Sequence, residues 1–202
     1  MTPKPVWIRD AEAVLGHPSA GGVVVSGGKI VEIVPRGGAP SRSAADSFDA
    51  SGKVLLPGLV NTHHHFFQTL SRSYRGALNK PLFAWLKALY PLWARLDEAA
   101  FRLGVRMALA ELALSGCTTT SDHHYLFPKG LERALDVEVE EAARVGLRVV
   151  LTRGSMSLSD QDGGLPPRSV VQDTEAILRD CERVVRAGAP EWSRRSCLEL
   201  LC

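Results

Sequence analysis

The chain has 202 residues, 45% of them hydrophobic and 23% charged, which is the composition of a globular protein able to bury a core in one or two small domains. A net charge of +2 gives no electrostatic basis for binding nucleic acid or an acidic membrane. No apolar run approaches the roughly 20 residues that cross a bilayer, and the N-terminus lacks a signal-peptide core. The four cysteines form no C-x-x-C pair, which favours a reduced, cytoplasmic setting.

The first 56 residues are typical of a small β unit without chemistry of its own. Residues 6–8 are apolar and predict a short strand. Residues 22–25 and 30–34 are β-branched runs on either side of a Gly-Gly turn, which predicts a hairpin. Residues 35–47 have the composition of a loop.

An apolar run, residues 54–62, leads directly into three consecutive histidines. If the run is a strand, successive side chains alternate between faces, so His63 and His65 share one face and His64 takes the other. Two imidazoles on one face of a strand can hold a single metal ion. A solvated loop or tag-like run is the alternative. Five of the six histidines, however, follow two strand-like runs, and this clustering favours a metal site.

Helical and strand-like segments alternate through the rest of the chain. Helices are expected at residues 81–90, from Asp97 as N-cap to a stop at Gly116, around residues 131–145 before Gly146, and around residues 177–187 before Gly188. Strands are expected at residues 117–121 and 147–151. The order strand, helices, strand, helix, strand, helix indicates parallel strands joined by right-handed crossovers.

Each expected inner strand is followed by polar side chains, which are His63 and His65, then Asp122, His123 and His124, and then Arg153 and Ser155. In a (β/α) barrel the carboxyl ends of the strands meet at one mouth, where the chemistry takes place. Under this interpretation His123 and His124 orient an imidazole that binds the metal. The alternative is that both are ordinary polar groups at the end of a strand.

These residues resemble the amidohydrolase superfamily, and within it the aminohydrolases of purine and triazine-like rings. The β unit followed by Pro-Gly-Leu-Val-Asn-Thr-His-x-His (57–65) carries the superfamily likeness. Residues 63–72, 82–86, 89–96, 153–158 and 163–167 are most similar to members that deaminate 8-oxoguanine. The resemblance implies an α/β fold: residues 57–202 form the N-terminal part of a (β/α)8, TIM-like barrel, and residues 1–56 form a β-sandwich segment before it.

The resemblance also implies one zinc ion, or another divalent metal, per full-length subunit. His63 and His65 match its first-strand ligands, and two further His and an Asp come from later strands. The metal activates water for attack on the ring carbon that carries the amine, which turns 8-oxoguanine into urate and ammonia. Gln68 and Arg153 match positions that contact substrate. The alternatives are a turn cap for Gln68 and a carboxylate partner for Arg153. A homo-oligomer is expected for the full-length form.

A complete (β/α)8 barrel needs about 250 residues, whereas 146 residues follow Leu56. The sequence therefore predicts an incomplete barrel of about three strand–helix units. No fourth strand is expected after residue 189, which leaves an open apolar edge on the third strand. The acid/base residue is expected beyond these units, so we expect the 202-residue chain to be inactive alone. The alternatives are an aminohydrolase of triazines or other aminated rings, and a non-catalytic fragment that associates with another chain.

Overall fold

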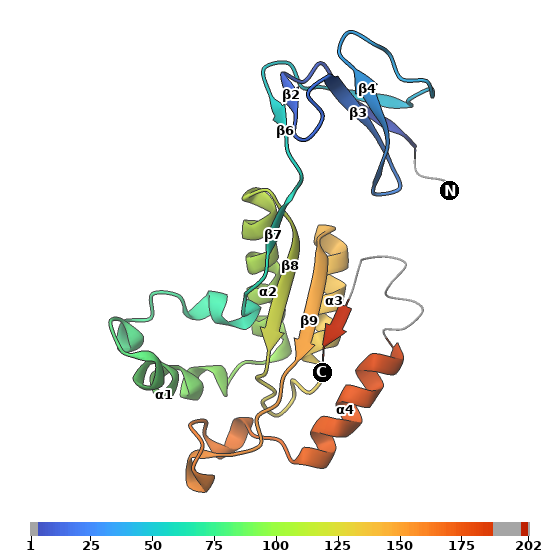
Figure 1. Ribbon diagram of the computed structural model, residues 1–202. Coiled ribbons are helices and arrows are strands. Elements are labelled where there is room, and N and C mark those ends of the chain that lie inside the picture. Colours follow the sequence, from blue (N-terminus) through green and yellow to red (C-terminus); the bar gives the residue numbers. More distant parts are fainter. Residues whose placement is uncertain (1–3, 188–198, 202) are drawn as a thin grey trace. The chain divides into compact units, whose positions relative to one another are not determined.

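A computed structural model describes residues 4–187 and 199–201 (Figure 1). The chain divides into two compact units, Met1–Pro57 and Gly58–Cys202. Within the described residues, no helix combines the length and apolar character that a membrane crossing requires.

The first unit is built from two small sheets. One has the strand order β4-β3-β1-β5, formed by β4 (Lys29–Pro35), β3 (Ala20–Ser26), β1 (Val6–Arg9) and β5 (Asp46–Asp49). The other pairs β2 (Ala13–Val14) with β6 (Val54–Leu55) in parallel. The predicted hairpin is confirmed, since β3 and β4 pair antiparallel. Gly27 and Gly28 at its turn both take positive φ values, +58° and +75°, as the tight turn requires. Residues 46–47, expected in the loop, begin β5.

The second unit contains a four-stranded parallel sheet with the order β10-β9-β8-β7. Its strands are β7 (Leu59–Asn61), β8 (Cys117–His124), β9 (Arg148–Arg153) and β10 (Glu199–Leu201). The main helices are α1 (Leu82–Trp93), α2 (Glu98–Leu114), α3 (Ala134–Val145) and α4 (Thr174–Ala187), and the short 3-10 turns are η1 (Phe66–Ser71), η2 (Arg75–Ala77), η3 (Asp160–Asp162) and η4 (Arg168–Val170). The predicted parallel alternation of strands and helices is confirmed (Figure 1).

The apolar run 54–62 is not one continuous strand. It forms β6 in the first unit and β7 in the second, with the break at Pro57 and Gly58. Proline lacks the amide hydrogen that a continuous ladder needs. A Cβ on Gly58 would lie 2.1 Å from the Thr118 side chain, so this backbone passes too close to β8 for any larger residue.

The expectation of no fourth strand after residue 189 is also wrong. Residues 199–201 form β10, which pairs in parallel with residues 150–152 of β9. The physical reason is the unpaired edge of β9, whose amide and carbonyl groups are satisfied by an added strand. The opposite edge of the sheet is β7, where Leu59 is 58% and Val60 65% exposed.

Helix ends follow the local signals in the sequence. Asp97 caps α2, because its Oδ1 accepts a hydrogen bond from the Ala100 amide at 2.8 Å. Gly116 and Gly146, with φ of +86° and +83°, follow α2 and α3 in the left-handed conformation that ends a helix. Gly188, the stop expected after α4, lies outside the described residues.

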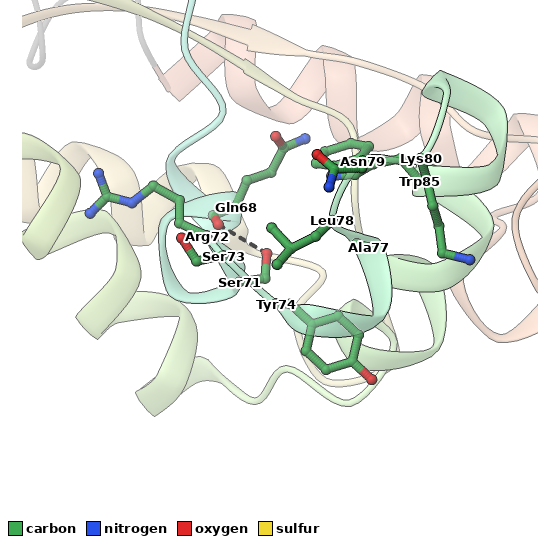
Figure 2. Close-up of a pocket in the computed structure, with 10 residues that line it drawn as sticks. All are labelled: Gln68, Ser71, Arg72, Ser73, Tyr74, Ala77, Leu78, Asn79, Lys80 and Trp85. Atoms are coloured by element: carbon green, nitrogen blue, oxygen red, sulfur yellow. Dashed lines mark hydrogen bonds between the residues drawn. The ribbon is translucent and has the colours of Figure 1, made fainter.

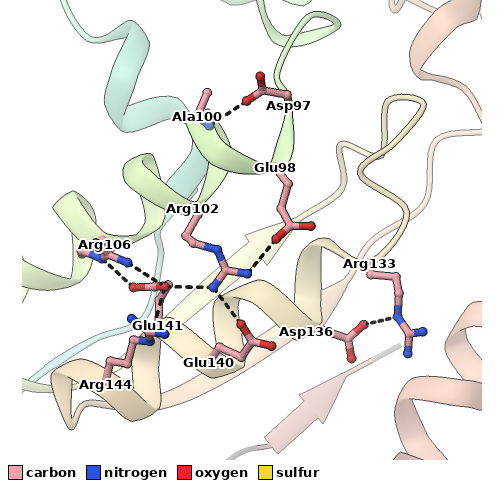
Figure 3. Close-up of polar contacts among 10 residues, drawn as sticks. All are labelled: Asp97, Glu98, Ala100, Arg102, Arg106, Arg133, Asp136, Glu140, Glu141 and Arg144. Atoms are coloured by element: carbon pink, nitrogen blue, oxygen red, sulfur yellow. Dashed lines mark hydrogen bonds and ion pairs between the residues drawn. The ribbon is translucent and has the colours of Figure 1, made fainter.

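Helices α2 and α3 are joined by an ion-pair cluster centred on Glu141 (Figure 3). The side chain of Glu141 is fully buried. It accepts two hydrogen bonds from Arg106, at 2.7 and 3.1 Å, and one from Arg102 at 3.0 Å. Arg102 also pairs with the exposed residues Glu98 and Glu140. The cluster therefore fixes α3 against α2, and the sheet residues beneath both helices are held with them.

Strand β8 presents two different faces. Thr120, Asp122 and His124 are fully buried, and the His124 ring packs edge-on against Phe101 of α2 at 5.1 Å. His123, one residue away, is only half-buried and lies on the other face. A single strand therefore supplies polar groups both to the core beneath the helices and to the open face of the sheet.

Candidate metal and substrate site

The imidazoles of His63 and His65 lie together just after the end of β7. Their ring centroids are 5.0 Å apart and their planes nearly perpendicular. His63 also stacks on His123, with centroids 4.8 Å apart. The structure therefore brings His63 and His65 together, as the sequence predicts, and adds the imidazole of His123 beside them. Imidazole nitrogen is a preferred zinc ligand, so the chemistry of this pair suits such an ion.

His65 is held in one orientation by β8. Its Nδ1 donates a hydrogen bond to the carbonyl oxygen of His123 at 2.7 Å. Because that carbonyl can only accept, Nδ1 carries the hydrogen and Nε2 keeps its lone pair. No hydrogen bond engages Nε2 within the part of the chain that the structure describes. Burial lowers the pKa of His65, and the charge of His63 acts in the same direction, which favours the neutral form that can coordinate a metal.

His64 takes the opposite side, as the alternation predicts. Its ring packs near Phe66, with centroids 5.1 Å apart. Burial lowers the pKa of His64 as well. Its Nδ1 is buried without a hydrogen-bond partner among the described residues. His64 therefore belongs to the packing around η1 and is separate from the pair on the other side.

A second group of metal-ligating side chains lies in the core beneath β8. Asp122, His124 and Glu138 are fully buried, and their ligand atoms lie within 4.8 Å of one another. His124 Nε2 donates to the Leu126 carbonyl at 2.7 Å, which leaves the Nδ1 lone pair facing Glu138 Oε1 at 3.2 Å. Burial lowers the pKa of His124 to about 4 and raises the pKa of Glu138 to about 8. A neutral imidazole therefore faces a carboxyl group that is largely protonated at neutral pH.

Gln68 lies on η1 and lines a pocket of about 440 Å³ (Figure 2). The pocket is lined by Gln68, Ser71, Arg72, Ser73, Tyr74, Ala77, Leu78, Asn79, Lys80 and Trp85. The Gln68 amide donates to the Tyr125 hydroxyl at 3.3 Å. The Tyr125 ring in turn lies edge-on to His65, with centroids 5.4 Å apart. Tyr125 thus links the residue that lines the pocket to the imidazole pair.

Arg153 lies at the end of β9, but on the buried face. Its Nε donates to Asp180 Oδ2 at 3.0 Å and its Nη2 to Gln172 Oε1 at 2.7 Å. The guanidinium also stacks on Phe127, 3.9 Å from the ring centroid. Arg153 therefore pairs with a carboxylate, which was the alternative to a substrate contact. A substrate role for Arg153 stays a prediction that this geometry does not support.

Sequence reasoning missed Tyr125 and Glu138. Tyr125 follows directly after the polar end of β8, so its position alone was a usable signal. Glu138 lies three residues after Leu135 on α3, and that spacing places it on the apolar face of the helix. A carboxyl group on an otherwise apolar helix face predicts a buried polar cluster.

Residues 54–197 match the amidohydrolase family. Over 182 residues the chain is 55% identical to 8-oxoguanine deaminase from Pseudomonas aeruginosa, covering 89% of this chain and 40% of that protein. Over 173 residues it is 32% identical to hydroxydechloroatrazine ethylaminohydrolase from Pseudomonas sp. strain ADP, covering 81% of this chain and 36% of that protein. A solved structure of atrazine chlorohydrolase from Arthrobacter aurescens TC1 complexed with zinc superposes with a TM-score of 0.83 at 23% identity, covering 97% of this chain and 46% of that one. The expected fold class is confirmed, and the chain spans less than half the length of these relatives.

Proposed function

This chain belongs to the amidohydrolase family, and on that premise we propose that it serves the metal-dependent hydrolytic deamination of a purine, 8-oxoguanine, to urate and ammonia. The observation that carries the proposal is the pairing of the His63 and His65 rings, 5.0 Å apart after β7. The 55% identity to 8-oxoguanine deaminase from Pseudomonas aeruginosa supports the choice of substrate.

We propose zinc, or another divalent cation, as the metal, since a structurally similar relative is complexed with zinc. Such an ion, when bound, activates water at neutral pH. His63 and His65 would hold it through their free ring nitrogens, while the hydrogen bond to the His123 carbonyl keeps His65 in the tautomer that leaves Nε2 available. Gln68 and Tyr125 would present an amide and a hydroxyl to the polar edge of the heterocycle.

A related aminohydrolase of triazines or other aminated rings is the second candidate. It is favoured by the 32% identity to hydroxydechloroatrazine ethylaminohydrolase. A non-catalytic chain that associates with a partner is the third, and the exposed Leu59 and Val60 on β7 favour it. A homo-oligomer of a longer form stays a prediction. Cys117 and Cys181 are free thiols, which supports the proposed cytoplasmic setting.

Metal binding tests the site directly. Zinc affinity of the purified 202-residue chain is measured by competition with a chromophoric chelator. His63→Asn and His65→Asn should each weaken binding at least ten-fold, because each removes one of the paired imidazoles. His64→Asn is the matched control, since the neighbouring ring faces the other way, and it should leave zinc affinity unchanged. Equal effects of all three substitutions would contradict the assignment of the pair.

Deaminase activity tests the reaction. We expect the 202-residue chain alone to release no urate from 8-oxoguanine, because the described residues offer two imidazoles to the metal where the family site needs further ligands. A chimera in which this chain replaces the matching 40% of the Pseudomonas aeruginosa enzyme should release urate, and its His63→Asn form should not. A folded chimera that accepts a triazine but not 8-oxoguanine would favour the second candidate.

A further inference from the structure

We propose that Asp122 is a positioning residue for His65, and that Glu138 and His124 support it from inside the core; the proposal rests on the proposed metal-binding role of His65. Asp122 lies on the buried face of β8, and its side chain reaches the chain segment that carries the imidazole pair. Its Oδ1 accepts a hydrogen bond from the Phe66 amide at 2.6 Å. Phe66 is the residue directly after His65, so this bond fixes the backbone on which the imidazole is mounted.

Three hydrogen bonds fasten residues 64–66 to the end of β8. Besides the bond from Phe66 to Asp122, the His65 ring donates to the His123 carbonyl at 2.7 Å. The His123 amide donates to the His64 carbonyl at 2.9 Å. Two of the bonds join a side chain to the backbone and the third joins backbone to backbone, and together they extend from a fully buried carboxyl to a half-buried ring. A shift of the Phe66 amide would therefore move the His65 ring away from the carbonyl that sets its tautomer.

Asp122 itself has little freedom to move. It is fully buried, and the carboxyl of Glu138 and the imidazole of His124 lie within 4.8 Å of it. Glu138 extends from α3, and the rings of Phe67, Phe101 and Phe127 make T-shaped contacts with the His124 ring at centroid distances of 4.7–5.6 Å. A carboxyl group enclosed in this way keeps one rotamer, because no other space is open to it.

The hydrogen bond from Phe66 needs an acceptor at Oδ1, and it does not need a charge. This separates a positioning role from a general contribution to the fold. Asp122→Asn keeps an acceptor oxygen in the same place, whereas Asp122→Leu keeps the volume and removes the acceptor. A residue that positions His65 should therefore tolerate Asn far better than Leu.

The first readout is the tautomer of His65 in the metal-free 202-residue chain, from the ¹⁵N shifts of its ring. The unmodified protein and Asp122→Asn should show a single form protonated at Nδ1, and Asp122→Leu should show a mixture of both tautomers. Leu151→Ala removes a buried side chain of β9 from the same core. It is the matched destabilising control and should leave the tautomer of His65 unchanged. Asp122→Leu that folds with a single Nδ1 tautomer would overturn the proposal.

The second readout is zinc affinity. Asp122→Leu should lower it by about 10- to 100-fold, the usual effect of losing a group that orients a ligand, and Asp122→Asn by less than about three-fold. Zinc that stays bound after both His63 and His65 are replaced by Asn would place the ion in the buried cluster and overturn the positioning role. An unmodified chain that binds no zinc would contradict the proposed function, while the tautomer measurement would still decide the role of Asp122.

A direct measurement covers the case in which Asp122→Leu does not fold. In the unmodified chain, the through-hydrogen-bond coupling between the Phe66 nitrogen and the Asp122 carboxyl carbon reports the contact itself. Detection of this coupling, together with a Phe66 amide protected from hydrogen exchange, supports the proposal. A rapidly exchanging Phe66 amide in a folded protein would overturn it.

Discussion

Glu141→Gln is the sharpest test of how the helical layer is held together. The substitution keeps the shape of the side chain, removes its charge and turns one acceptor oxygen into a donor that faces a guanidinium. In the folded protein Glu141 is fully buried and accepts three hydrogen bonds from Arg102 and Arg106 (Figure 3). The bonds from Arg106 are bidentate, the strongest arrangement of this pair.

The expected loss follows from these contacts. A hydrogen bond to a charged group contributes about 1.5–3 kcal/mol, and removing one partner of a buried ion pair costs about 3–5 kcal/mol. The side chains of Arg102 and Arg106 are partly exposed, 25% and 49%, so water can reach them when the carboxylate is lost. We therefore expect a loss of roughly 2–3 kcal/mol in the free energy of unfolding, which lowers Tm by about 5–10 °C.

Thermal unfolding followed by far-UV circular dichroism at 222 nm measures this loss, since all the described α-helices lie in the second unit. Glu140→Gln is the matched control: this neighbour is 58% exposed and makes one bond to Arg102, so its loss should stay below about 0.5 kcal/mol. The Arg106 hydrogen bonds lower the pKa of Glu141, so its contribution is present above about pH 4.5 and is lost as the pH falls. Equal Tm values for the two variants at pH 7 would refute the reasoning.

Two further predictions concern Glu138 and Gly58. Burial raises the pKa of Glu138 from 4.5 to about 8, so the folded state binds the carboxyl proton more tightly than the unfolded state does. The free energy of unfolding should therefore fall as the pH rises from about 4.5 through 8, by at most about 5 kcal/mol. Glu138→Gln should flatten that decline in urea unfolding measured from pH 5 to 9, and an unchanged slope would show that Glu138 titrates normally. Gly58→Ala should lower Tm by several degrees because its Cβ would overlap Thr118 at 2.1 Å; a Tm equal to that of the unmodified protein would contradict the close approach.

Much of the second unit could be predicted from the sequence, because its signals are local. The Asp97 cap, the glycines after α2 and α3, and the apolar spacing of Phe101 and Val105 depend only on nearby residues. The proximity of the His63 and His65 rings agrees with the alternation of side chains expected along an extended backbone, and both residues lie just after the last residue of β7.

The remaining features depend on contacts between distant segments. The close approach of the Gly58 backbone is to Thr118, sixty residues later, and β10 forms because the edge of β9 is open to pairing. Arg153 ends strand β9 in the position of a site residue, and its burial depends on partners far along the chain, such as Asp180 on α4. None of these contacts leaves a periodic trace in the sequence.

The two faces of β8 tie the buried cluster and the imidazole pair to a single alignment of neighbouring strands. Thr120 pairs with Asn61 on one side and Val149 on the other. A slip of one residue would turn His123 inward and push Asp122 and His124 outward. The buried cluster and the contacts of the imidazole pair would then be lost through the same error. A chain with β8 out of register would therefore lack the whole site, and the site forms only when this strand pairs correctly.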